Sequence, residues 1–185
     1  MIVDAVIPLL LEHGRDVTTK QIAESAGIAE GTLFRAFGDK ESIISAAVEK
    51  FLDPEPLRQM FRGIDPEEPL ERKVHDIIFH LRTRFEGILG IMAAVGMTGK
   101  PPGPRSRFGN PELLADLIAE NADVLRIEPH RVASFIRMVA FASSLPPLPE
   151  SSPFTTDELT DLVLHGVLGA PATLDPESRN DQGND

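Results

Sequence analysis

The side chains best suited to catalysis or metal binding are scattered through this sequence. None of the five histidines lies four residues from another, and His75 and His80, five apart, would diverge on a helix. The chain has no cysteine, which excludes disulfides and thiolate metal sites. A glycine-rich phosphate loop, a nucleophile elbow and a paired-carboxylate motif are all missing from the sequence. We therefore expect neither an enzyme nor a metal site, and no cofactor.

Residues 18–48 carry the most informative pattern in the chain. Apolar side chains at 22–26 give a short helix one apolar face, and Gly27 supplies the left-handed residue that ends it. Leu33 and Phe37, four residues apart, place an apolar stripe on the next helix. Two helices joined by a short glycine-containing turn form a helix-turn-helix, whose second helix lies in the major groove of DNA.

Two more helices complete the N-terminal part. Asp39 stands where its carboxylate can cap a third helix, which continues to about residue 52. An earlier helix is predicted over residues 2–13, with Pro8 expected to kink it or to mark its start. The prolines in 53–56 break the chain. We take residues 1–52 as a three-helix DNA-binding domain.

This segment resembles the N-terminal DNA-binding domain of the TetR family of bacterial transcriptional regulators. The family's Thr, Ile-Ala, Ala-Gly, Gly-x-Leu, Phe and Lys-Glu residues recur here in one unbroken register. The matches are Thr18-Thr19, Ile22-Ala23, Ala26-Gly27-Ile28, Gly31-Thr32-Leu33-Phe34, Phe37, Lys40-Glu41 and Ile43. This specific match covers about 35 residues plus the helix before it. The rest of the chain is similar only in being helical and of suitable length.

The resemblance implies a set of DNA-contacting positions. They fall on Thr19, Glu30, Gly31, Thr32, Phe34, Arg35 and Lys40. Arg35 could read a guanine edge through two hydrogen bonds, and Lys40 is expected to bind phosphate at the positive end of its helix.

Several departures from the family pattern weaken the expected affinity for DNA without affecting the fold. Ala29-Glu30 stands where Ser-Lys is common, Phe34 where Tyr is usual and Ala36 where His is frequent. The family also has a short basic arm before its first helix, with no counterpart before Ile2. That leaves either a start further upstream or a protein without minor-groove contacts.

The charge balance bears on how DNA is bound. The net charge is −11, and residues 1–40 hold four Lys and Arg against six carboxylates. Non-specific binding depends on Lys and Arg against phosphate. Either the few cations face the DNA, so that base contacts dominate, or this domain has weak or no affinity for DNA.

The remaining sequence predicts an all-α body over residues 53–170. Apolar patterns indicate helices at 57–64, at about 66–97 with a break near Gly87, and at 112–125, 129–145 and 156–168. Asp65 is expected to cap the long helix, with Pro66 at its first position. Residues 171–185 have almost no apolar content, which predicts a disordered tail.

The resemblance also implies a ligand cavity and a dimer interface in the body. The cavity residues would be Phe61, His75, Phe79, His80, Met92, Val95 and Met97. The interface residues would be Phe135, Ile136, Val139, Ala140, Leu159, Leu162, Val163 and Gly166. For both sets the alternative is an ordinary place in the core or on the surface.

These patterns together favour a ligand-responsive transcriptional regulator, most simply a repressor that binds a palindromic DNA operator as a homodimer. A small-molecule effector would enter the body and change the spacing of the two recognition helices. No stretch approaches the roughly 18 apolar residues of a membrane span, and we expect a cytoplasmic protein. Two alternatives stay open, namely a TetR-like small-molecule-binding or interaction module with weakened or lost DNA binding, and a helical scaffold for protein partners.

Overall fold

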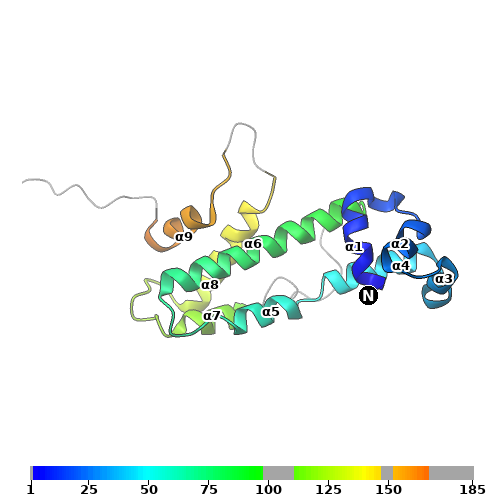
Figure 1. Cartoon of the computed structure of the whole chain (residues 1–185). Coiled ribbons are helices and arrows are strands. Elements are labelled where there is room, and N and C mark those ends of the chain that lie inside the picture. The colour runs from blue at the N-terminus through cyan, green and yellow to red at the C-terminus, as the bar shows by residue number, and fades with distance from the viewer. Residues whose placement is uncertain (1, 98–110, 147–151, 167–185) are drawn as a thin grey trace, which may run out of the picture.

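The computed structural model describes residues 2–97, 111–146 and 152–166, and over these ranges the protein contains only helices and their connections (Figure 1). The elements are α1 (Ile2–His13), η1 (Gly14–Asp16, a 3-10 turn), α2 (Thr19–Ala26), α3 (Glu30–Phe37), α4 (Lys40–Phe51), α5 (Glu55–Arg62), α6 (Leu70–Ala94), α7 (Pro111–Ala119), α8 (Pro129–Ser143) and α9 (Thr156–His165). We call α1 to α4 the head and α5 to α9 the body. The predicted all-α fold class is confirmed.

The helices of the head surround a hydrophobic core that is separate from the core of the body. Val6 and Leu10 of α1, Ile22 of α2, Leu33 of α3 and Ile43 of α4 are each fully buried in this core. The apolar face of α1 packs against both α2 and α4, and these two helices in turn contact α3.

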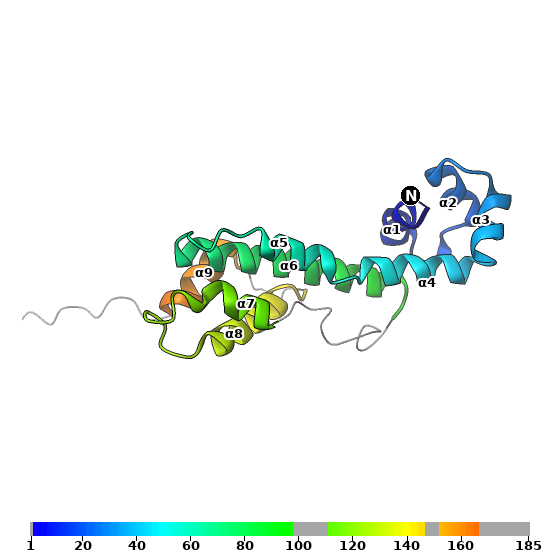
Figure 2. The ribbon, with the colours of Figure 1, turned by 90° about the horizontal axis from the view of Figure 1, so that it is seen from below.

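Helix α6 connects the two parts of the molecule. Its first half, from Val74 to Phe85, lies in the body core, whereas Ile88 to Val95 complete the core of the head. In Figure 1, α6 runs from the head to the bundle of α7, α8 and α9 at the other end. Figure 2 shows α5 following α4 and running beside α6. A single helix therefore contributes side chains to both cores.

Helix α6 is continuous, so the predicted break at Gly87 is wrong. A Cβ at position 87 would lie 3.0 Å from Cζ of Phe51. The absence of a side chain at this position allows the end of α4 to pack closely against α6. The predicted end of the helix near Gly96 is correct, because Gly96 takes the left-handed φ of +65° just beyond Val95.

Two other local predictions also differ from the structure. Helix α1 begins at Ile2 and includes Pro8, so Pro8 does not mark its start. Asp65 does not cap α6, which begins four residues after Pro66. Instead the Asp65 carboxylate accepts from the backbone N–H of Glu67 at 3.0 Å, closing a turn. Asp-Pro is as typical of a turn as of a helix start.

The last three helices are present, and α7 and α8 are shorter than the sequence predicts. Helix α7 ends at Ala119, where a run of turns begins, and α8 ends at Ser143. Helix α9 begins with the expected capping box, in which Thr155 and Glu158 bond each other's backbone N–H groups. The predicted continuation of α9 to 168 and the tail 171–185 lie outside the described residues. Within the described helices, none has the length and apolar character needed to cross a membrane.

Candidate DNA interface and body surfaces

Local signals in the sequence build the helix-turn-helix. The Thr18 hydroxyl accepts from the Gln21 backbone N–H at 3.2 Å, and the Gln21 side chain accepts from the Thr18 N–H at 2.8 Å. This reciprocal pair starts α2. Gly27 ends it with φ of +67°, and its N–H donates to the carbonyls of Ala23 and Glu24. The chain then turns into α3 within a few residues.

Helix α3 presents one face to the head core and the other to solvent. Leu33 is fully buried and Phe37 packs against the same core. Gly31, Phe34 and Arg35 are exposed, with Phe34 at 44%. The exposed face of a recognition helix is the face that enters the major groove.

The predicted DNA-contacting side chains meet in two small groups. The Thr19 hydroxyl donates to the Glu30 carboxylate, which joins the starts of α2 and α3. Farther along α3, Arg35 donates from Nε to the Gly31 carbonyl at 3.3 Å and from Nη2 to the Thr32 hydroxyl at 3.5 Å. The guanidinium is therefore held along the exposed face of the helix.

Lys40 is engaged within the protein. Its Nζ donates a 2.8 Å hydrogen bond to the backbone carbonyl of Arg15 in η1. Beside it, Asp39 caps α4 by accepting from the Ser42 N–H at 2.7 Å, and the hydrogen bonds from Ser42 lower the pKa of Asp39 below its usual value of 3.8. An ammonium group has three donors, so two of those on Lys40 stay available for phosphate.

In the head, α3 follows α2 after a glycine turn and exposes one face to solvent, which is the arrangement of a helix-turn-helix. Residues 2–47 match the bacterial regulatory proteins of the tetR family. Among solved structures, the chain is similar to the TetR transcriptional regulator SCO0520 from Streptomyces coelicolor, with 27% identity, a TM-score of 0.57 and coverage of 89% of this chain and 95% of that one. The head is therefore similar to the DNA-binding domain of TetR-family regulators, and most of the chain shares the fold of one such regulator.

The chain is also similar to two other proteins. The TetR family regulator PfmR from Thermus thermophilus shares the fold at 18% identity, with a TM-score of 0.54 and coverage of 91% of this chain and 99% of that one. A Bacillus subtilis protein described as an uncharacterized HTH-type transcriptional regulator, YvkB, is 42% identical over 50 residues. That match spans 26% of each chain, so it concerns about a quarter of the relative's length.

The residues predicted to line one ligand cavity are separated in the structure. Phe61 is fully buried in the body core and has an edge contact with His80, while Phe79 is half exposed. His75 lies on the surface of α6, with its ring nitrogens 2.9 Å from Asp76 and 3.3 Å from Asp157 of α9. The three others, Met92, Val95 and Met97, pack with the head. These seven residues do not form one pocket.

A cavity lies at the end of the body far from the head. It has a volume of about 570 Å³, between the start of α6, the turn before α8 and the end of α9. Its walls include Leu70, Leu125 and Val132, and its rim holds Arg126 and His165. Phe135, Leu162, Val163 and Gly166, all predicted as interface residues, also line it.

The predicted interface residues divide between core and surface. Ile136 and Ala140 are fully buried within this chain and Leu159 is 5% exposed, so they cannot contact a partner directly. The exposed apolar side chains of α8 are instead Phe135, Met138 and Phe141. Met138 and Phe141 were not among the predicted interface residues, although the successive spacing of three residues from Phe135 to Met138 to Phe141 places neighbours on one side of the helix. No cluster of His, Asp and Glu that could hold a metal occurs in 2–97, 111–146 or 152–166.

Proposed function

We propose that this regulator binds a palindromic operator as a homodimer, with one α3 in each of two successive major grooves. The observation that carries the proposal is the exposed face of α3, with Arg35 held along it by Gly31 and Thr32. Arg35 would read guanine and Thr32 would contact a thymine methyl or a phosphate. Gly31 would allow close approach of the backbone, and Phe34 would add an apolar contact.

The starts of α2 and α4 would supply the contacts to the DNA backbone. Thr19 would contact phosphate, and Lys40 would bind phosphate with the donors that Arg15 leaves unused. Glu30 is close to the same surface and repels phosphate, although it could accept a hydrogen bond from cytosine N4. A domain with so few cations would depend on base contacts more than on charge.

Dimerisation would use the exposed face of α8. Phe135, Met138 and Phe141 are 42%, 62% and 43% exposed, an unusual concentration of large apolar groups on one helix of a monomer. Pairing this face with its copy, together with the surface of α9, would bury it. Two recognition helices are required because a single helix reads only a half-site.

The response to a ligand would be transmitted through α6. A small molecule in the 570 Å³ body cavity would contact Leu70 at the start of this helix, whose far end lies in the head core. A volume of this size is within the roughly 300–1,000 Å³ typical of small-molecule sites. Binding that favours one position of α6 would change the spacing of the two heads and release the operator, as in a repressor.

A regulator with weakened DNA binding is the second candidate, and it is favoured by the Glu30 carboxylate at the start of α3. Fluorescence anisotropy distinguishes the two candidate functions. The purified protein is titrated on DNA flanking its own gene and on a shuffled control, each at two salt concentrations. Tight, sequence-dependent binding supports the operator proposal. Equal and salt-abolished binding to both DNAs contradicts it, and a large gain in Glu30→Lys from undetectable binding supports the second candidate.

A further inference from the structure

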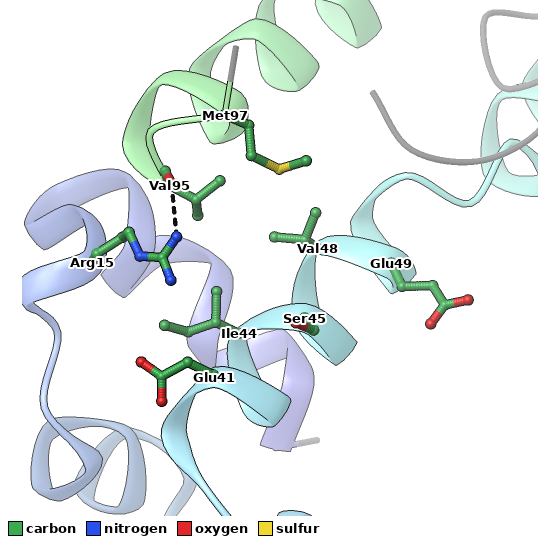
Figure 3. A pocket seen from close by; sticks show the side chains of 8 residues that line it. All are labelled: Arg15, Glu41, Ile44, Ser45, Val48, Glu49, Val95 and Met97. Atoms are coloured by element: carbon green, nitrogen blue, oxygen red, sulfur yellow. Dashed lines mark hydrogen bonds between the residues drawn. The ribbon is translucent and has the colours of Figure 1, made fainter. Parts of the chain in front are cut away.

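A second cavity lies where the head meets the end of α6, far from the body cavity. It has a volume of about 310 Å³ and is lined from three elements: Arg15 of η1, the outer surface of α4, and the residues that end α6. Figure 3 shows the side chains of Ile44, Val48, Val95 and Met97 converging on it. Ile44, Val48 and Val95 are nearly buried, so the cavity has a firm apolar floor.

The charged side chains around this floor point in different directions. The Arg15 guanidinium points over the cavity, and its Nη1 donates to the Val95 carbonyl at 3.4 Å (Figure 3). The carboxylates of Glu41 and Glu49 point away from the apolar side chains in Figure 3, and both residues are exposed. In the described part of the chain, no carboxylate forms an ion pair with Arg15. The group that faces into the cavity is thus a cation with unused N–H donors.

We propose that this junction cavity binds a small amphipathic carboxylate, such as an arylacetic or short-chain acid. The carboxylate would pair with the Arg15 guanidinium, whose planar fork matches two carboxylate oxygens. The hydrocarbon part would cover Ile44, Val48, Val95 and Met97. The volume is at the lower end of the roughly 300–1,000 Å³ range of small-molecule sites, so the ligand is small.

The site lies on the connection between α6 and the DNA-binding surface. Arg15 accepts from Lys40 through its backbone carbonyl at 2.8 Å and donates to Val95 through its side chain. Gly14, next to it, takes φ of +58°, and a Cβ there would be 2.9 Å from the Ala94 carbonyl oxygen. A carboxylate bound by the unused donors of Arg15 would lie beside the Val95 contact and this close packing. The effect on operator affinity rests on the proposed function, whereas the binding itself does not.

The test uses the full chain labelled with ¹³C in its methionine methyl groups and no DNA. Phenylacetate is titrated at 0.15 M salt, where charges more than about 8 Å apart are largely screened. We expect a saturable shift of the Met97 methyl signal, with Met60 and Met138 unchanged as internal controls. Neutral phenylacetamide has nearly the same shape, and it should bind about tenfold more weakly or worse, because it lacks the charge-assisted pair.

Variants show which side chains contact phenylacetate. Arg15→Gln should weaken phenylacetate binding about tenfold or more, and Glu41→Gln should leave it unchanged or tighter. Ser45 of α4 also lines the cavity. Ser45→Leu should fill the cavity without changing Arg15, and it should therefore abolish phenylacetate binding. Ser45→Ala is the matched control. A Met97 signal that does not move with phenylacetate overturns the proposal, as does a shift that survives Arg15→Gln. Preferential binding of benzyltrimethylammonium, lost in Glu41→Gln, would show a cation site and also overturn it.

Discussion

Arg84 of α6 holds the C-terminal end of α4 by donating from Nη1 to the Phe51 carbonyl at 2.6 Å. Its Nη2 donates to the Asp53 carbonyl at 2.8 Å, and the guanidinium also lies 5.5 Å from the centre of the Phe51 ring. The last carbonyls of a helix have no partner within the helix, and a cation is favoured there by the helix dipole. A single residue of α6 therefore fixes the point where the head leads into the body.

Replacing Arg84 should loosen this junction. We expect Arg84→Ala to lower the free energy of unfolding by about 1–3 kcal/mol, since the lost hydrogen bonds involve a charged donor and are partly shielded from water. Urea denaturation followed by circular dichroism measures the change. Arg72→Ala is the matched control, because Arg72 contacts Asp76 only at 3.6 Å on the surface and should cost about 0–1 kcal/mol. Equal effects of the two variants would contradict the assigned role of Arg84.

Arg35 should determine sequence preference at one position of each half-site. Loss of two hydrogen bonds to a guanine edge costs about 1–3 kcal/mol, so Arg35→Ala should weaken operator binding roughly 5- to 150-fold. The side chain is exposed, so stability should be unchanged. Anisotropy titrations on operator DNA measure the loss, with Arg62→Ala on α5 as a control outside the head. If Arg35→Ala binds the operator as tightly as the unaltered protein, Arg35 does not take part in base recognition.

The exposed face of α8 should control assembly. A charge at Met138 in the centre of the proposed interface would be buried without a partner, so Met138→Glu should weaken dimerisation roughly 100-fold or more. Light scattering coupled to size-exclusion chromatography gives the mass directly. Ala122→Glu, at an exposed position in the turn after α7, should leave the mass unchanged. A dimer that persists in Met138→Glu would move the interface elsewhere.

The head could be predicted from sequence because its signals are short-range. The cap at Thr18 and the turn at Gly27 each involve residues within three or four positions, and Asp39 caps α4 in the same way. Such signals do not depend on how the rest of the chain packs. The same is true of Thr155 and Glu158 at the start of α9.

The errors arise where a distant residue decides the outcome. Gly87 is a helix breaker by type, but it serves to accommodate Phe51, thirty-six positions earlier. Helix α8 is apolar on more than one face, and only its packing against α6 and α7 shows that Ile136 is inside and Met138 outside. The hydrogen bond from Arg15 to Val95 joins residues eighty positions apart, and no local sequence pattern predicts it.

Acid should destabilise the head in part through Asp39. Hydrogen bonds from Ser42 lower its pKa in the folded protein below the usual 3.8. The cap therefore contributes fully above about pH 4, and its contribution declines as the pH falls through the lowered folded value. Asn is also a good N-cap but does not titrate, so Asp39→Asn should lose less stability than the unaltered protein between pH 6 and pH 3. Thermal denaturation at the two pH values measures the difference, with Asp65→Asn as a control at a carboxylate outside any helix start. Identical pH sensitivity in Asp39→Asn and the unaltered protein would show that protonation of this cap does not contribute to acid unfolding.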